Sequence, residues 1–164
     1  MLSRKAKYGL KALLFLAQRV EEGPVLIEEL ATKERIPHRF LEQILLDLKR
    51  KGVLSSKKGR RGGYQLGRSP EEIFIGDVVR VLDGPLAPVP CVSVTAYRRC
   101  DECLDERGCG IRAVMQDVRD GIAEILDNTS ISDMLRRMAR QTKADRGKRG
   151  FSRSRREPAA RRPR

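Results

Sequence analysis

Four cysteines fall within nineteen residues of this 164-residue chain, with the spacing Cys91-x8-Cys100-x2-Cys103-x5-Cys109. Thiolates are soft donors that bind iron–sulfur clusters or zinc, and a Cys-x2-Cys pair chelates either. A structural zinc site more often shows two such pairs, whereas only one is present here. The spacing therefore leaves three hypotheses open: an iron–sulfur cluster, a zinc ion, or metal-free thiols that are either redox-active or inert.

Basic side chains form a second distinctive set, and they are unevenly distributed. The net charge is +13, with +9 in residues 1–70, −7 in residues 71–135 and +11 in residues 136–164. Segregated positive charge favours a polyanion as partner, and nucleic acid is the natural one. No run of about 18 apolar residues that could span a membrane exists, and no export signal is evident at the start. We therefore predict a cytoplasmic nucleic-acid-binding protein without membrane contact.

Apolar spacing predicts the helices that position this charge. A helical stripe predicts an amphipathic helix over residues 3–21. A short helix, a tight turn near residues 35–36 and a longer helix over 37–51 follow in the rhythm of a helix-turn-helix. Pro37 suits the first turn of the longer helix, and Gly52 suits its C-terminal cap.

The candidate DNA contacts lie on this longer helix and on a predicted β-wing after it. In a major groove Arg39 could bind guanine, Gln43 adenine and Glu42 cytosine, whereas Lys49 and Arg50 suit phosphates. The wing has a basic, glycine-rich tip that cannot cover a core and can approach the sugar-phosphate chain. For any single helix residue, a merely solvated charge is the alternative. The full candidate set is His38, Arg39, Glu42, Gln43, Lys49, Arg50, Lys57, Lys58, Arg60, Arg61 and Tyr64.

A heptad seam follows the cysteines and predicts a helix over residues 110–128, about 28 Å long at 1.5 Å per residue. Packing against the chain's own first helix is one explanation of the seam. We favour pairing in a homodimer, because one helix-turn-helix binds only half of a two-fold operator. The seam residues are Ile111, Met115, Val118, Ile122 and Ile125.

The predicted fold is mainly α with a small β-wing: a winged helix-turn-helix plus a long dimerisation helix. Thr129 and Ser130 are predicted to cap a last short helix, and the residues after it have no apolar period. The predicted units are a DNA-binding domain over 1–84, a cysteine-containing sensor loop over 85–109, the dimerisation helix and short C-terminal helix over 110–138, and a disordered basic tail over 139–164.

Four motifs resemble the Rrf-two family of winged helix-turn-helix transcriptional regulators, the IscR, NsrR and CymR group. They are KYGLKAL at 7–13, FLEQIL at 40–45, RGGYQLG at 61–67 and IGDVVRVLDG at 75–84, and the similarity spans residues 1–135. The resemblance implies a dimeric regulator, with repression as the expected outcome, that binds an operator through the second helix of the motif and the wing. It also implies a sensing centre in the loop before the dimerisation helix.

The resemblance also bears on the cysteines. The cluster-binding branch of the family has three cysteines in this loop, and Cys91 and Cys109 match the outer two. The middle one is either Cys100 or Cys103, which leaves one extra cysteine. Arg112 stands where one cluster-binding group has a histidine, and Lys7 stands near where another takes a carboxylate from the partner subunit. Our hypothesis is that the extra cysteine replaces these ligands. An iron–sulfur cluster on four thiolates, sensing iron, redox state, nitric oxide or sulfur status, is then expected; the candidate ligands are Cys91, Cys100, Cys103 and Cys109.

Three other functional classes fit the sequence less well. An enzyme is disfavoured because the one histidine, His38, begins the predicted recognition helix, and neither a phosphate-binding loop nor a nucleophile–base pair is visible. A zinc-stabilised protein-interaction module leaves the charged wing unexplained. A nonspecific nucleoid-type DNA binder would bind operator and random DNA with little difference.

Overall fold

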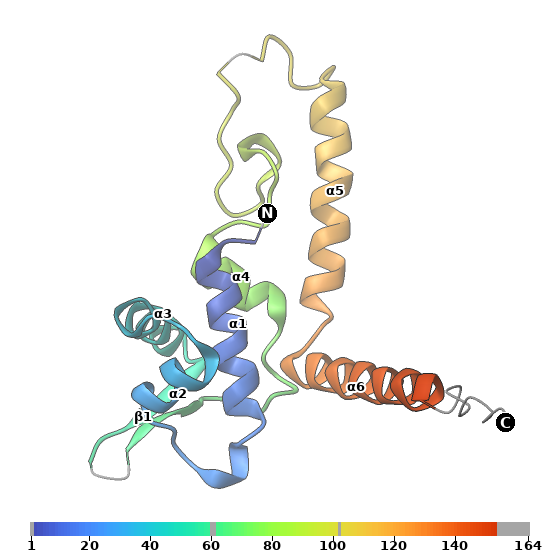
Figure 1. Cartoon of the computed structure of the whole chain (residues 1–164). Helices are drawn as coiled ribbons and strands as arrows, with labels where there is room; N and C mark the ends of the chain where they lie inside the picture. The colour runs from blue at the N-terminus through green and yellow to red at the C-terminus, as the bar shows by residue number, and fades with distance from the viewer. Residues whose placement is uncertain (1, 60–61, 102, 154–164) are drawn as a thin grey trace, which may run out of the picture.

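The structure is a computed structural model that describes residues 2–59, 62–101 and 103–153. Figure 1 shows a cluster of helices with a small hairpin, a long helix that stands away from it beside an irregular loop, and a last helix that leaves at its base. None of the described helices is both long and apolar enough to cross a membrane. The elements are α1 Arg4–Ala17, η1 Val20–Glu22, α2 Ile27–Glu34, α3 His38–Arg50, β1 Leu54–Lys57, β2 Gly63–Leu66, α4 Ile75–Asp83, η2 Pro90–Val92, α5 Gly110–Asp127 and α6 Ile131–Arg153.

Helix α1 runs through the middle of the core. Its apolar stripe packs against α3 and α4, and Leu13 is completely buried between them. The helix begins at Ser3, whose hydroxyl accepts a hydrogen bond from the Ala6 amide at 3.1 Å. The Ser3 amide in turn donates to a carboxylate oxygen of Asp83 at 2.9 Å. The start of α1 is therefore tied to the end of α4.

The predicted helix-turn-helix is confirmed, with α2 and α3 as its helices. Arg35 adopts the left-handed conformation, with φ 54°, and its amide donates to carbonyls at the end of α2. Ile36 follows and is 4% exposed, so the turn is pinned to the core by one apolar side chain. Pro37 is the N-cap of α3 rather than its first helical residue. Gly52 has φ 69° just after α3, as a C-terminal glycine requires.

The two strands form the predicted wing as an antiparallel pair. Leu54 pairs with Leu66 at the base, and Lys57 pairs with Gly63 nearest the tip. Val25, ahead of α2, forms an isolated bridge to Tyr64 and holds the hairpin against the helices. Gly63 has φ 144°, and a Cβ there would lie 2.3 Å from the Val25 carbonyl oxygen. Only glycine lets the wing pass this close to the chain before α2.

Helix α5 joins the core at its C-terminal end. Arg80 of α4 makes a two-pronged ion pair with Asp127, at 2.6 and 2.8 Å. The Ile75 amide donates to the Thr129 carbonyl, and the Ile131 amide donates to the Ile73 carbonyl, both at 2.9 Å. These bonds hold the junction between α5 and α6 against α4.

Helix α6 is longer than predicted, and the prediction of disorder from residue 139 is wrong for residues 139–153. Ser130 caps the helix as predicted, because its hydroxyl accepts from the Asp133 amide while Asp133 accepts from the Ser130 amide. Beyond Met138 the chain lacks an apolar period, but six of residues 139–153 are lysine or arginine, which have good helix propensity. Residues 154–164 of the predicted tail lie outside the described residues.

Candidate DNA-binding surface and cysteine site

Helix α3 places its polar face outward because its apolar face is completely buried in the core. Leu41, Ile44, Leu45 and Leu48 are each 0% exposed in the core. This anchoring fixes the rotation of the helix, since turning it would bring these side chains into water. All six predicted DNA contacts of the helix are exposed; they are His38, Arg39, Glu42, Gln43, Lys49 and Arg50.

Asp47, which the sequence reasoning missed, organises one side of this face. Its carboxylate lies 2.8 Å from the Lys5 ammonium, accepts from the Gln43 side-chain amide at 3.0 Å and lies 3.5 Å from Arg50. The hydrogen bond from Lys5 is the main cause that lowers the pKa of Asp47. The spacings to Gln43 and Arg50 are those of neighbours on a helix surface, which was the available signal. Lys5 lies on α1, far from Asp47 in the sequence, so no local spacing indicated this contact.

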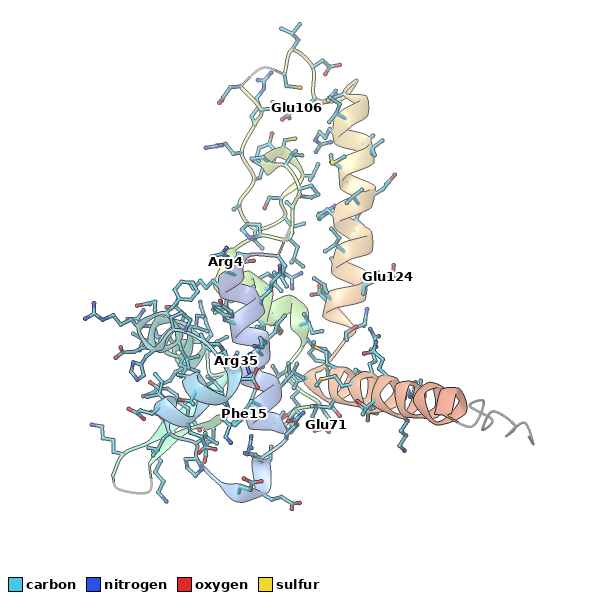
Figure 2. All side chains as sticks on the ribbon, in the orientation of Figure 1. Arg4, Phe15, Arg35, Glu71, Glu106 and Glu124 are labelled. Atoms are coloured by element: carbon cyan, nitrogen blue, oxygen red, sulfur yellow. The ribbon has the colours of Figure 1, made fainter. Side chains whose placement is uncertain are left out.

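The beginning of α3 lies against α2. His38 Nε2 is 3.7 Å from a carboxylate oxygen of Glu28, a pair that is ionic only when the imidazole is protonated. Arg35, labelled in Figure 2, occupies the turn between the two helices with its side chain exposed. The N-terminal end of the predicted recognition helix is therefore open to solvent.

The wing residues divide into two groups. Lys57 and Lys58 are exposed, as a phosphate-binding role requires. Tyr64 is half-buried against the core, so part of its ring stabilises the fold. Arg60 and Arg61 of the predicted set lie outside the described residues.

The four cysteines line one cavity of about 600 Å³ between the loop and the start of α5. All four are free thiols. Cys91 is buried in η2, Cys100 is exposed, and Cys103 and Cys109 are intermediate. The four residues share this cavity, and their convergence on one metal centre stays a prediction. Among the described residues, no three Cys, His, Asp or Glu side chains are close enough to hold a metal ion.

Cys103 and Cys109 are the most closely associated pair. Burial and then the neighbouring Cys109 raise the pKa of the Cys103 thiol. The Cys103 amide donates to the Cys100 carbonyl at 3.2 Å, which curls the Cys-x2-Cys segment into a turn. The Cys109 sulfur accepts from the Arg112 amide at 3.4 Å and so caps α5.

The donor set fits a soft metal centre in its chemistry. Four thiols face one cavity whose lining is mainly apolar, and the Arg98, Arg99 and Arg112 side chains also line it. A metal ligand must be a thiolate, whereas burial and the neighbouring Cys109 raise the pKa of the Cys103 thiol in the metal-free chain. The carboxylate of Glu106 instead accepts from the Tyr97 hydroxyl at 2.7 Å.

Helix α5 exposes much of the predicted seam. The structure buries none of its residues, and Ile111 is 72% exposed and Ile125 63% exposed. Val118 and Ile122 are also exposed, and Met115 is half-buried. The face also includes Val114, 57% exposed, which the seam had omitted. The alternative that the seam packs on α1 is not what the described chain shows.

Comparison with known proteins places this geometry in a family. A model of the Rrf2 family, described as iron-dependent transcriptional regulators, matches residues 2–137. The chain belongs to the Rrf2 family. It is 46% identical over 138 residues to a putative rrf2-like regulator of Rhodobacter capsulatus, across 82% of this chain and 92% of that protein. It is 33% identical over 133 residues to the regulator CymR of Bacillus subtilis, across 81% and 88% of the two chains.

Solved Rrf2 structures share the fold. The structure of CymR, titled the global cysteine regulator of B. subtilis, matches with a TM-score of 0.68 and 32% identity, across 82% of this chain and 95% of that one. The structure of T. potens IscR matches with a TM-score of 0.67 and 30% identity, across 84% and 88%. This Rrf2 chain is therefore a DNA-binding transcriptional regulator with the winged-helix fold.

Proposed function

We propose that this regulator binds a two-fold operator as a homodimer paired through α5, and that its four cysteines hold an iron–sulfur cluster that controls operator affinity. The observation that carries the proposal is the single cavity lined by Cys91, Cys100, Cys103 and Cys109 at the start of α5. In that arrangement the sensing residues and the pairing helix are one continuous unit. A cluster would supply redox and nitric-oxide chemistry there.

The exposed apolar face of α5 supports the dimer. Ile111, Val118 and Ile125 recur at helical spacing and stay in water in the single chain. Burying such side chains against a second copy is favourable by about 25 cal/mol per Å² of apolar area. Two recognition helices then match two half-sites, which one helix cannot do.

A mechanical link between the cysteines and DNA also supports the proposal. Cys91 sits in η2, which packs against α5, and Asp127 at the other end of α5 is clamped by Arg80 of α4. Helix α4 packs on α1 and α3, so a shift of α5 is passed to the recognition helix. Operator affinity then depends on the state of the loop through coupled equilibria.

A metal-free thiol regulator is the second candidate, and zinc is the third. The thiol alternative is favoured by the absence of a three-ligand group among the described residues and by the relative whose title names a cysteine regulator. It predicts a colourless protein with free thiols. Zinc predicts a colourless protein with one equivalent of metal.

The deciding experiment is purification without oxygen, followed by a visible spectrum with iron, zinc and acid-labile sulfide analysis. Charge-transfer absorption near about 400 nm with matching iron and sulfide supports the cluster. Cys103→Ala should abolish it, whereas Cys103→Ala with retained iron would exclude a four-thiolate site. A colourless sample with stoichiometric zinc would sink the cluster hypothesis.

Dimerisation and operator binding are tested separately. Val118→Glu with Ile122→Glu places two charges on the exposed face of α5 and should give monomers in sedimentation velocity. The matched control, Gln116→Glu with Asp117→Asn, alters exposed polar positions of the same helix and keeps its net charge. Monomeric wild-type protein that still binds a two-fold operator cooperatively would contradict the proposal.

A further inference from the structure

We infer that the exposed stretch of α6 beyond the family match is a second DNA-contacting surface, which binds phosphates flanking the sequence read by the winged helix. This inference rests on the DNA binding of the winged helix. The family model ends at residue 137, whereas α6 continues to Arg153. Most of α6 therefore lies beyond the part of the chain that the family model matches.

The described side chains of this stretch are open to solvent and positively charged. Every residue from Arg136 to Ala144 is exposed. Arg136, Arg140 and Lys143 follow one another at i, i+4 and i+7, which places them on one helix face. Arg137 lies beside that face.

One of these four cations is engaged within the chain. Arg136 donates to Asp133 and to the Ser132 hydroxyl in the first turns of α6. Among the side chains that the structure describes, no carboxylate forms an ion pair with Arg137, Arg140 or Lys143. Across the whole helix, residues 131–153 hold eight arginines and lysines against two aspartates. Such a density of like charge matches a polyanion.

The position of α6 separates it from the cysteine loop and places it on the side opposite α3 and the wing, so it would meet DNA flanking the sequence that the winged helix contacts. Figure 1 shows α6 leaving the base of α5, at the end nearest α1 and α4 and farthest from the loop. The 18 residues of 136–153 span about 27 Å at 1.5 Å per residue. Duplex DNA carries one phosphate charge per about 1.7 Å of axis, so a helix of this length can meet several phosphates.

The extension should add affinity without adding sequence preference, because phosphate contacts carry no base information. It should therefore strengthen binding to operator and to random DNA by the same factor. This separates the inference from the proposed function, in which α3 discriminates between sequences.

The test is the triple variant Arg137→Gln, Arg140→Gln, Lys143→Gln in the full-length chain. Glutamine keeps helix propensity while removing charge, and circular dichroism checks the helix content. Binding to operator and to random duplex is measured from 50 to 300 mM salt. We expect the slope of log affinity against log salt to become shallower by up to about 2.7, since each of the three lost phosphate contacts removes about 0.9. Affinity should fall at least tenfold at the lowest salt, with the operator-to-random ratio unchanged.

Two controls make the result specific. Arg107→Gln removes one exposed charge in the cysteine loop, before the start of α5, and is compared with the single variant Arg140→Gln; only the latter should change the slope. Equal slopes for wild type and the triple variant would overturn the inference. A triple variant that instead weakens self-association in sedimentation, with unchanged slopes, would assign the α6 face to contact between copies and would also overturn it. Equal affinity of the wild-type protein for operator and random duplex would count against the proposed function alone.

Discussion

The winged-helix unit and the α5 region differ in how much of their apolar surface they bury and in whether their buried polar atoms find hydrogen-bond partners. The buried apolar cluster lies within residues 6–82, with Ile131 as its one member from beyond α4. Helix α5 buries no residue, and the Nε atoms of Arg112 and Arg119 are buried without a hydrogen-bond partner among the described residues. The first region is finished by its own sequence. The second leaves apolar side chains of α5 in water in the single chain.

The largest expected contrast comes from truncating one apolar side chain in each region. Leu48→Ala, at a site 0% exposed, should lower the free energy of unfolding by about 3 kcal/mol. Ile111→Ala, 72% exposed, should change it by less than about 0.5 kcal/mol in dilute protein. Urea unfolding at several concentrations measures both. The cost of Ile111→Ala should grow with concentration if a second copy covers α5, and a large cost at high dilution would break the comparison.

The joint between the two regions, which is the Arg80–Asp127 ion pair between α4 and the end of α5, is tested next by Gly76→Ala. A Cβ there would lie 1.8 Å from Asp127 Oδ1 and 2.9 Å from an Arg80 guanidinium nitrogen, so the ion pair must move. We expect a loss of about 1–2 kcal/mol and faster amide exchange at the end of α5. Gly110→Ala is the matched control, because its Cβ would meet nothing within 4 Å. Equal effects of the two variants would show that the clamp does not join the regions.

Two cysteines of the loop before α5 provide a smaller contrast, because one is buried and the other is exposed. Cys91→Ser puts a hydroxyl into a site 8% exposed and should cost about 1 kcal/mol in metal-free protein. Cys100→Ser, at an exposed site, should cost less than about 0.5 kcal/mol. Thermal unfolding of the metal-free variants measures this difference. Both should nevertheless lose iron if four thiolates are needed, and iron retained in either variant would remove that cysteine from the ligand set.

Acid should affect the joint and the cap of α6 before it affects the core. Arg80 lowers the pKa of Asp127, and the amide and hydroxyl of Ser130 lower the pKa of Asp133 to about 2. A carboxyl whose folded pKa is depressed stabilises the fold above its unfolded pKa of about 4, and the contribution is lost as pH falls toward the folded value. Melting temperature should therefore drop between about pH 4 and pH 2. Asp133→Asn should flatten that drop slightly, and an unchanged profile would exclude the cap as a cause.

The sequence predicted those parts of the fold in which local pattern and burial agree. The turn at Arg35 and Ile36 and the C-terminal glycine of α3 leave local signals, and both were located correctly. The wing was found from its glycines and short apolar strands. The length of α6 was missed because apolar periodicity reports packing, whereas residues 139–144 of the helix are exposed.

The candidate site was only partly predictable for the same reason. The exposed face of α3 follows from its helical period, but the Lys5–Asp47 contact joins two helices distant in sequence. Spacing placed all four cysteines in one loop. It could not show that Cys91 is buried while Cys100 is exposed, because burial in an irregular loop depends on what packs over it.

The capping role of Cys109 has a consequence for how chemical information enters the protein. The sulfur that ends the cysteine loop is also the acceptor that satisfies the amide of Arg112 in the first turn of α5. Any reaction that occupies that sulfur leaves an orphan donor at the start of the helix. A change in the chemical state of this one sulfur would therefore act first on the opening turn of α5.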